Sequence, residues 1–225
     1  MDYLAPEQIV LWDKRMAHEG AEYTTPDPEL VKRIIELDAK GRAALDLGCG
    51  AGRHLVFLAE QGWYVTGVDW SHSALARAHQ TLQESNQQAT LVKGDVRRLN
   101  FDVATFSLII TTNVLNHGKI ADFKRALREI KRVLRIGGTA VFSVPSTLNA
   151  PLDANLNWIE EQTLVPADGL EAGIPHHFFT DAELSEACAN FREAVIDRVV
   201  EPLPPGIAPL HPEHVNEWFW VTLIG

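Results

Sequence analysis

The 225-residue chain has only two cysteines, Cys49 and Cys188, and it lacks long apolar runs. Two cysteines cannot build a disulfide framework or a cysteine-based zinc site. No stretch approaches the roughly 20 apolar residues that a membrane-spanning helix needs. The N-terminus has neither the basic region nor the apolar region of a signal peptide. We therefore expect a soluble, cytoplasmic protein in a reducing compartment.

The chain also lacks an excess of positive charge, because 20 Lys and Arg stand against 30 Asp and Glu, a formal net charge of −10. Nucleic-acid binding needs a basic face. The one basic run, residues 124–135, alternates with apolar positions as a solvated helix face does. We expect neither nucleic acid nor a membrane as a partner. With 46% hydrophobic residues and no repeat, the chain can bury a core.

In the middle of the chain, short apolar runs alternate with amphipathic runs, a pattern that favours βαβ units and a parallel sheet. The fourth predicted strand is a continuous apolar run, which favours burial on both faces. A basic amphipathic helix precedes the fifth strand, and Gly137 with Gly138 is expected to end it. The predicted strands cover residues 43–47, 64–68, 90–92, 107–111, 139–144, 194–200 and 218–224.

The strongest motif is the segment DLGCGAG at 46–52, which closes a strand and opens a helix. Glycine lets the backbone turn tightly and approach a ligand, and the free amides of a helix start attract anionic groups. A dinucleotide-binding loop would place its third glycine at position 53, where Arg53 stands. A P-loop is excluded because no Gly-Lys-Ser/Thr follows. A nicotinamide-dependent dehydrogenase is therefore the weaker alternative, testable by NAD binding.

The glycine spacing 48, 50, 52 after an acid resembles motif I of the class I methyltransferases that use S-adenosylmethionine (SAM). Later segments agree with the family in order, and the resemblance covers about residues 42–146. The segment HFFTDAEL at 177–184 loosely resembles the small-molecule branch that includes tellurite-resistance-like methyltransferases. The agreeing segments are VDW at 68–70, GDV at 94–96, TTNVLNH at 111–117 and LRIGG at 134–138.

This resemblance implies an α/β fold that is Rossmann-like, with a seven-stranded mostly parallel sheet, helices on both faces and an antiparallel last strand. A single domain is expected over 1–225. It would comprise a helical cap (1–40), a SAM-binding core (41–146), an insertion or lid after strand five (147–178), and a C-terminal helix with strands (179–225). Ligands bind at the carboxyl ends of strands in such sheets, so the cap and the insertion flank the expected site.

The resemblance also implies SAM as cofactor and S-adenosylhomocysteine as product. Asp69 would accept hydrogen bonds from the ribose hydroxyls, and Trp70 would lie against adenine. Asp95 and the amide of Val96 would hydrogen-bond the edge of the adenine ring. Asp46 either ties down the glycine loop or reaches the methionine amino group, and both roles stay open. The cofactor-binding set is Asp46, Gly48, Gly50, Gly52, Arg53, Asp69, Trp70, Asp95, Val96 and Thr111.

His117 is the candidate catalytic residue, since a histidine near pH 7 suits proton abstraction; a helix-start histidine without chemistry is the favoured alternative. Asn113 and Asn116 either orient a substrate or cap the following helix. Trp12 and Tyr23 either stack on a ligand or pack into the core.

We expect no metal site from the sequence. His176 and His177 are adjacent, and neighbours on an extended chain point to opposite sides. His211 and His214 lie in a proline-rich segment with Glu213 as an available third ligand. Neither pair alone makes a complete ligand set.

The expected reaction is transfer of the SAM methyl group to a small-molecule acceptor by in-line displacement, which needs mainly positioning and exclusion of water. A methyltransferase acting on protein or nucleic acid is one alternative, although TTNV at 111–114 replaces the NPPY-like motif. A SAM-binding module without catalysis is another, because its cofactor residues would look the same. A monomer and a homodimer both remain open.

Overall fold

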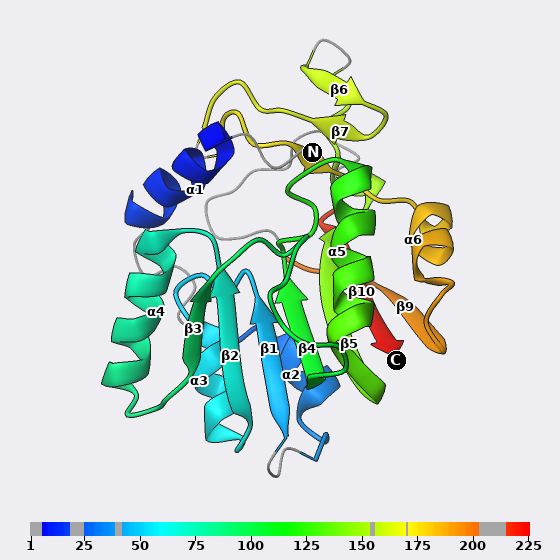
Figure 1. The fold of residues 1–225 in the computed structure, drawn as a ribbon. Helices are drawn as coiled ribbons and strands as arrows, with labels where there is room; N and C mark the ends of the chain where they lie inside the picture. Colours follow the sequence, from blue (N-terminus) through cyan, green and yellow to red (C-terminus); the bar gives the residue numbers. More distant parts are fainter. Residues whose placement is uncertain (1–5, 19–24, 39–41, 154–155, 170, 203–214) are drawn as a thin grey trace.

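A seven-stranded sheet forms the centre of the molecule in the computed structural model (Figure 1). The structure describes the chain except residues 1–5, 19–24, 39–41, 154–155, 170 and 203–214. The strand order is β3-β2-β1-β4-β5-β10-β9. β10 runs antiparallel to both of its neighbours, β5 and β9, and the other neighbouring strands pair in parallel, which confirms the predicted mostly parallel sheet. The strands are β1 (Ala43–Leu47), β2 (Tyr64–Asp69), β3 (Thr90–Lys93), β4 (Phe106–Thr112), β5 (Leu134–Pro145), β9 (Glu193–Val200) and β10 (Glu217–Ile224).

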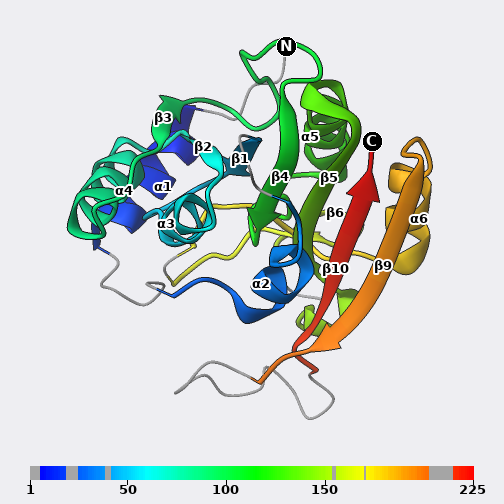
Figure 2. The ribbon, with the colours of Figure 1, turned by 90° about the horizontal axis from the view of Figure 1, so that it is seen from below.

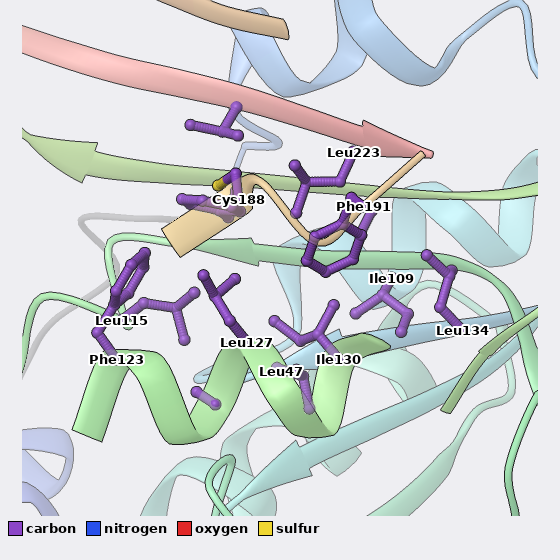
Figure 3. Close-up of a cluster of buried hydrophobic side chains, with 14 of the residues drawn as sticks. Leu47, Ile109, Leu115, Phe123, Leu127, Ile130, Leu134, Cys188, Phe191 and Leu223 are labelled. Carbon is purple, nitrogen blue, oxygen red and sulfur yellow. The ribbon is translucent and has the colours of Figure 1, made fainter. Parts of the chain in front are cut away.

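Helices cover both faces of the sheet, and each face has its own apolar cluster. One cluster packs α5 and α6 against the sheet through Phe123, Ile130 and Cys188 (Figure 3). The other packs α2, α3 and α4 on the opposite face, and Figure 2 shows α2 beneath the sheet. β4 is buried on both faces, as its apolar run predicts. The helices are α1 (Pro6–His18), α2 (Pro28–Ile34), α3 (Arg53–Glu60), α4 (His72–Glu84), α5 (Ile120–Val133) and α6 (Asp181–Cys188).

Helix starts are fixed by side-chain caps that follow local chemistry. The Ser71 hydroxyl accepts a hydrogen bond from the amide of Ala74 at the start of α4. Thr180 and Glu183 form a capping box at the start of α6. Each cap satisfies helix amides that would otherwise lack partners, so these boundaries were predictable from sequence.

The end of α5 differs from the prediction. The helix stops at Val133, because Leu134 is extended (φ −74°, ψ 133°) and already pairs with Phe106 of β4. Gly137 and Gly138 lie inside β5 instead, where Gly137 takes a left-handed φ of +72°. Strand pairing therefore ends the helix before the glycines are reached.

The segment between β5 and α6 contains a small antiparallel sheet that the sequence pattern did not predict. Its strand order is β6-β7-β8, and it hydrogen-bonds the loop after β4 through the amide of His177 and the carbonyl oxygen of Asn116 (2.8 Å). This places the segment beyond the carboxyl ends of the parallel strands, near α1 (Figure 1). Its elements are η1 (Thr147–Asn149), β6 (Trp158–Glu160), β7 (Thr163–Leu164) and β8 (His176–His177).

Candidate cofactor and acceptor site

A cavity of about 500 Å³ opens where the parallel strands end. Gly48 follows β1, Asp69 ends β2, Gly94 follows β3 and Thr112 ends β4, and all four line the cavity. Open α/β sheets bind ligands at this edge, and the volume suits a small-molecule site.

The glycine loop shapes the floor of the cavity. A side chain at Gly48 (φ +69°) would meet Val114 at 2.5 Å, so this position allows only glycine. At Gly50 (φ +52°) an added Cβ would find only the Met16 side chain, 3.8 Å away. The backbone at Gly50 is therefore bare toward the cavity, as a ligand that approaches closely requires. This cradle fits the cofactor implied by the sequence.

Asp69 lies at the bottom of the cavity and is 9% exposed. One carboxylate oxygen accepts a hydrogen bond from the amide of Gly50 (3.0 Å), and the other from the amide of Ser71 (2.9 Å). Burial raises the pKa of Asp69, while these amides act in the opposite direction. A carboxylate held by fixed amides in a cavity is well suited to accept hydrogen bonds from a ligand diol.

Asp46 stands behind the glycine loop and does not line the cavity. It is 2% exposed, and its Oδ2 has no hydrogen-bond partner. Burial raises the pKa of Asp46 to about 7, and the nearby Arg53 opposes the rise. Both roles predicted for Asp46 remain open.

Asp95 lies beside the cavity rather than on its wall, while Arg97 lines it. The Arg97 guanidinium makes a two-pronged ion pair with Asp95 and a second one with Asp122 on α5. Arg97 was missed from sequence because its role depends on α5, which lies far along the chain. The Asp95 carboxylate is therefore paired with the Arg97 guanidinium, and Arg97 rather than Asp95 lines the cavity.

The roof of the cavity combines α1, the loop after β4 and the segment after β5. The ring centroids of Trp12 and His117 are 4.7 Å apart, and those of His117 and His176 are 4.9 Å apart. Burial lowers the pKa of His117 well below its usual range, and the nearby His176 and Arg15 lower it further. The His117 ring is therefore neutral at pH 7.

The structure brings most of the predicted site residues to one cavity. Tyr23 and the residues 211–214 lie outside the described residues. Met16, Arg97 and Glu171 also line the cavity without having been predicted, and no local motif marks them. Asp46, Gly52, Asp95, Thr111 and Asn116 are not on its wall. Those that line it are Trp12, Gly48, Gly50, Arg53, Asp69, Trp70, Val96, Asn113 and His117.

The strand-end cavity, the left-handed glycine loop and the acid that closes β2 are the features that the resemblance to the class I SAM-dependent methyltransferases implies. Residues 44–138 match the family model described as a methyltransferase domain. This stretch, less than half of the chain, is similar to that family. Among the described residues, no helix is long and apolar enough to cross a membrane.

Curated relatives match only part of the chain. It is 37% identical over 98 residues to an uncharacterized methyltransferase, sll0829, of Synechocystis, covering 44% of each protein. It is 30% identical over 121 residues to a ubiquinone biosynthesis O-methyltransferase of Coxiella burnetii, covering 54% of this chain and 50% of the relative. The chain spans about half the length of the curated relatives it matches.

Solved structures show the fold over most of the chain. A 1,6-didemethyltoxoflavin-N1-methyltransferase of Burkholderia thailandensis, solved with 1,6-didemethyltoxoflavin and S-adenosylhomocysteine, is 20% identical with a TM-score of 0.67, covering 100% of this chain and 92% of that one. A SAM-dependent methyltransferase of Methanosarcina mazei is 17% identical with a TM-score of 0.67, covering 89% and 98%. At these identities the likeness is one of fold.

Proposed function

We propose that this protein transfers a methyl group from SAM to a small-molecule acceptor. The observation that carries the proposal is a single cavity with two kinds of wall. One wall is the glycine loop with Asp69, which suits the cofactor. The other is the roof with Trp12, His117 and Glu171, which suits an acceptor.

Several further features support a small acceptor. A cavity of about 500 Å³ is in the range of small-molecule sites, and a net charge of −10 disfavours nucleic acid. Two similar proteins carry names that point to small acceptors, namely the ubiquinone biosynthesis enzyme and the didemethyltoxoflavin enzyme. The tellurite-resistance-like branch, the cytoplasmic location and the monomeric or dimeric state stay predictions.

The chain contributes mainly binding and positioning. When bound, SAM supplies a methyl group on a positively charged sulfur that leaves readily. The glycine loop and Asp69 would hold the cofactor, and the aromatic roof would exclude water from the acceptor end. His117 is neutral and can accept a hydrogen bond from an acceptor. Its low pKa makes it a weak proton acceptor, which favours an orienting role over general-base catalysis.

Isothermal titration of the full chain with S-adenosylhomocysteine, with NADH as control, tests the cofactor. We expect micromolar binding of the first compound alone. Binding of NADH alone, or of neither, would contradict the proposal. Transfer of labelled methyl groups to a panel of hydroxyl, thiol and amine acceptors then tests catalysis. Tight cofactor binding without transfer to any member would favour a non-catalytic SAM-binding module.

A further inference from the structure

Three side chains from separate segments meet at the roof of the cavity. His117 comes from the loop after β4, Glu171 from the segment between β7 and β8, and His176 from β8. Each offers one ligand atom, and these atoms all lie within 4.8 Å of one another. It is the one group of this kind found among the residues that the structure describes.

We propose that His117, Glu171 and His176 bind a divalent transition-metal ion at the roof of the cavity. Two imidazoles and one carboxylate form a ligand set used for zinc and for ferrous iron. From the sequence alone, we considered His176 only together with its neighbour His177 and expected no metal site. The fold supplies different partners, because His177 turns away to hydrogen-bond Thr163 (2.7 Å between Nδ1 and Oγ1).

The spacing of the ligand atoms suits a common ion. His176 Nε2 and Glu171 Oε2 are 2.9 Å apart. Two ligand atoms bound at about 2.1 Å from one ion, at a right angle, are about 3 Å apart. The His117 ring is perpendicular to the His176 ring, at 90°. A small displacement of His117 completes the triad, since its ligand atom is already within 4.8 Å of the other two.

Neighbouring groups hold two of the three ligands, Glu171 and His117, in place. Arg15 on α1 forms an ion pair with Oε1 of Glu171, which leaves Oε2 facing His176. The backbone amide of His117 donates a hydrogen bond to the carbonyl oxygen of Val114 (3.1 Å), which fixes the backbone that carries the His117 ring. Partners like Arg15 orient carboxylate ligands in characterised metal sites. The Arg15 charge also offsets part of the Glu171 charge, so the site favours ions that bind imidazole strongly over Mg²⁺ or Ca²⁺.

Three protein ligands leave coordination positions open, and His117 and Glu171 both line the cavity. An ion there would select an acceptor that carries a hydroxyl, thiol or carboxylate able to coordinate it. This last step rests on the proposed methyl transfer; the metal site itself does not.

Cobalt binding tests the site directly. The full chain, without a histidine tag and treated with chelator, is titrated with Co²⁺ while visible absorption is recorded. We expect one equivalent to bind and give a ligand-field band. Glu171→Gln and His176→Gln should each weaken binding by at least about 10-fold. His79→Ala, which changes an exposed histidine on α4, should bind like the wild type.

Absence of a one-equivalent site in the wild type, or equal binding by Glu171→Gln and His176→Gln, overturns the proposal. Titration of every variant with S-adenosylhomocysteine shows whether each is folded and separates the two proposals. Cofactor binding without cobalt binding would remove the metal site and leave the proposed function standing. Cobalt binding without cofactor binding would contradict the proposed function and leave the metal site standing.

Discussion

The guanidinium of Arg97 donates hydrogen bonds to both carboxylate oxygens of Asp95, with Nε 2.9 Å from Oδ1 and Nη2 2.7 Å from Oδ2. Its remaining nitrogen, Nη1, lies 2.9 Å from Oδ1 of Asp122. The Arg97 side chain is only 8% exposed. Arg97 thereby connects the turn after β3 to the first turn of α5. Its two ion pairs stabilise this part of the cavity wall.

Loss of this clamp should destabilise the fold. Arg97→Ala leaves half-buried Asp95 without this cation and leaves Asp122 with the longer ion pair to Arg125 (3.6 Å). We expect a loss of about 2 kcal/mol in the free energy of unfolding. Arg192→Ala is the matched control, because Arg192 pairs with Glu193 at a site where both side chains are 63% exposed. Such pairs contribute about 0–1 kcal/mol. Urea unfolding measures both; equal losses would refute the clamp.

Asp69 and Asp95 should differ in their effect on cofactor affinity. Asp69 lines the cavity and Asp95 does not. Asp69→Ala should weaken S-adenosylhomocysteine binding about 10- to 100-fold, since hydrogen bonds to a charged group are worth about 1.5–3 kcal/mol. Asp95→Asn, which keeps one acceptor oxygen for Arg97, should weaken it less. Titration calorimetry decides, and unchanged affinity in Asp69→Ala would mean that the site is misassigned.

Substitutions at two glycines, Gly50 and Gly62, distinguish the effect of backbone strain from that of direct contact with the ligand. Gly50 and Gly62 both have a left-handed φ, +52° and +89°, and neither is crowded. Each change to alanine should destabilise the fold by about 1 kcal/mol. Gly50→Ala should also weaken S-adenosylhomocysteine binding at least about 10-fold, because its methyl group enters the cavity. Gly62→Ala should leave affinity intact; if it weakens binding equally, strain rather than contact explains the loss.

Asp46 should make the ligand-free protein less stable as pH rises. Its folded-state pKa is about 7, above the usual 3.8, so the folded state holds this proton more tightly than the unfolded chain. The resulting stability is fully present below about pH 4 and is lost as pH rises through 7. Relative to Asp46→Asn, which has no proton to lose, the wild type should lose up to about 4 kcal/mol. Urea unfolding of both proteins between about pH 4 and pH 8 measures this difference, and a constant difference would contradict the prediction.

The sheet and its helices were readable from sequence because their signals are local. Alternating apolar runs mark strands, and caps such as Ser71 and Thr180 mark helix starts. The end of α5 was misplaced because the conformation of Leu134 is set by its pairing with Phe106, which is distant in sequence, and not by the glycines that follow. Local rules fail where a strand partner sets the conformation.

The floor of the cavity was readable for the same reason, since Gly48, Gly50 and Asp69 lie in motifs at strand ends. The roof was not. Glu171 and Arg15 carry no motif, and they meet only because the segment after β5 folds back onto the loop that follows β4. A carboxylate in an irregular segment gains its partners from tertiary structure alone, which no spacing in the sequence reveals.

The position of β10 has a consequence for how the chain acquires its structure during synthesis. β10 fills the place between β5 and β9, and Phe219, Val221 and Leu223 are buried there. Until residues 217–224 emerge from the ribosome, β5 keeps an unpaired edge and β9 has no neighbour in the sheet. Such edges invite pairing with other chains. The nascent protein therefore completes its sheet only after residues 217–224 have been synthesised.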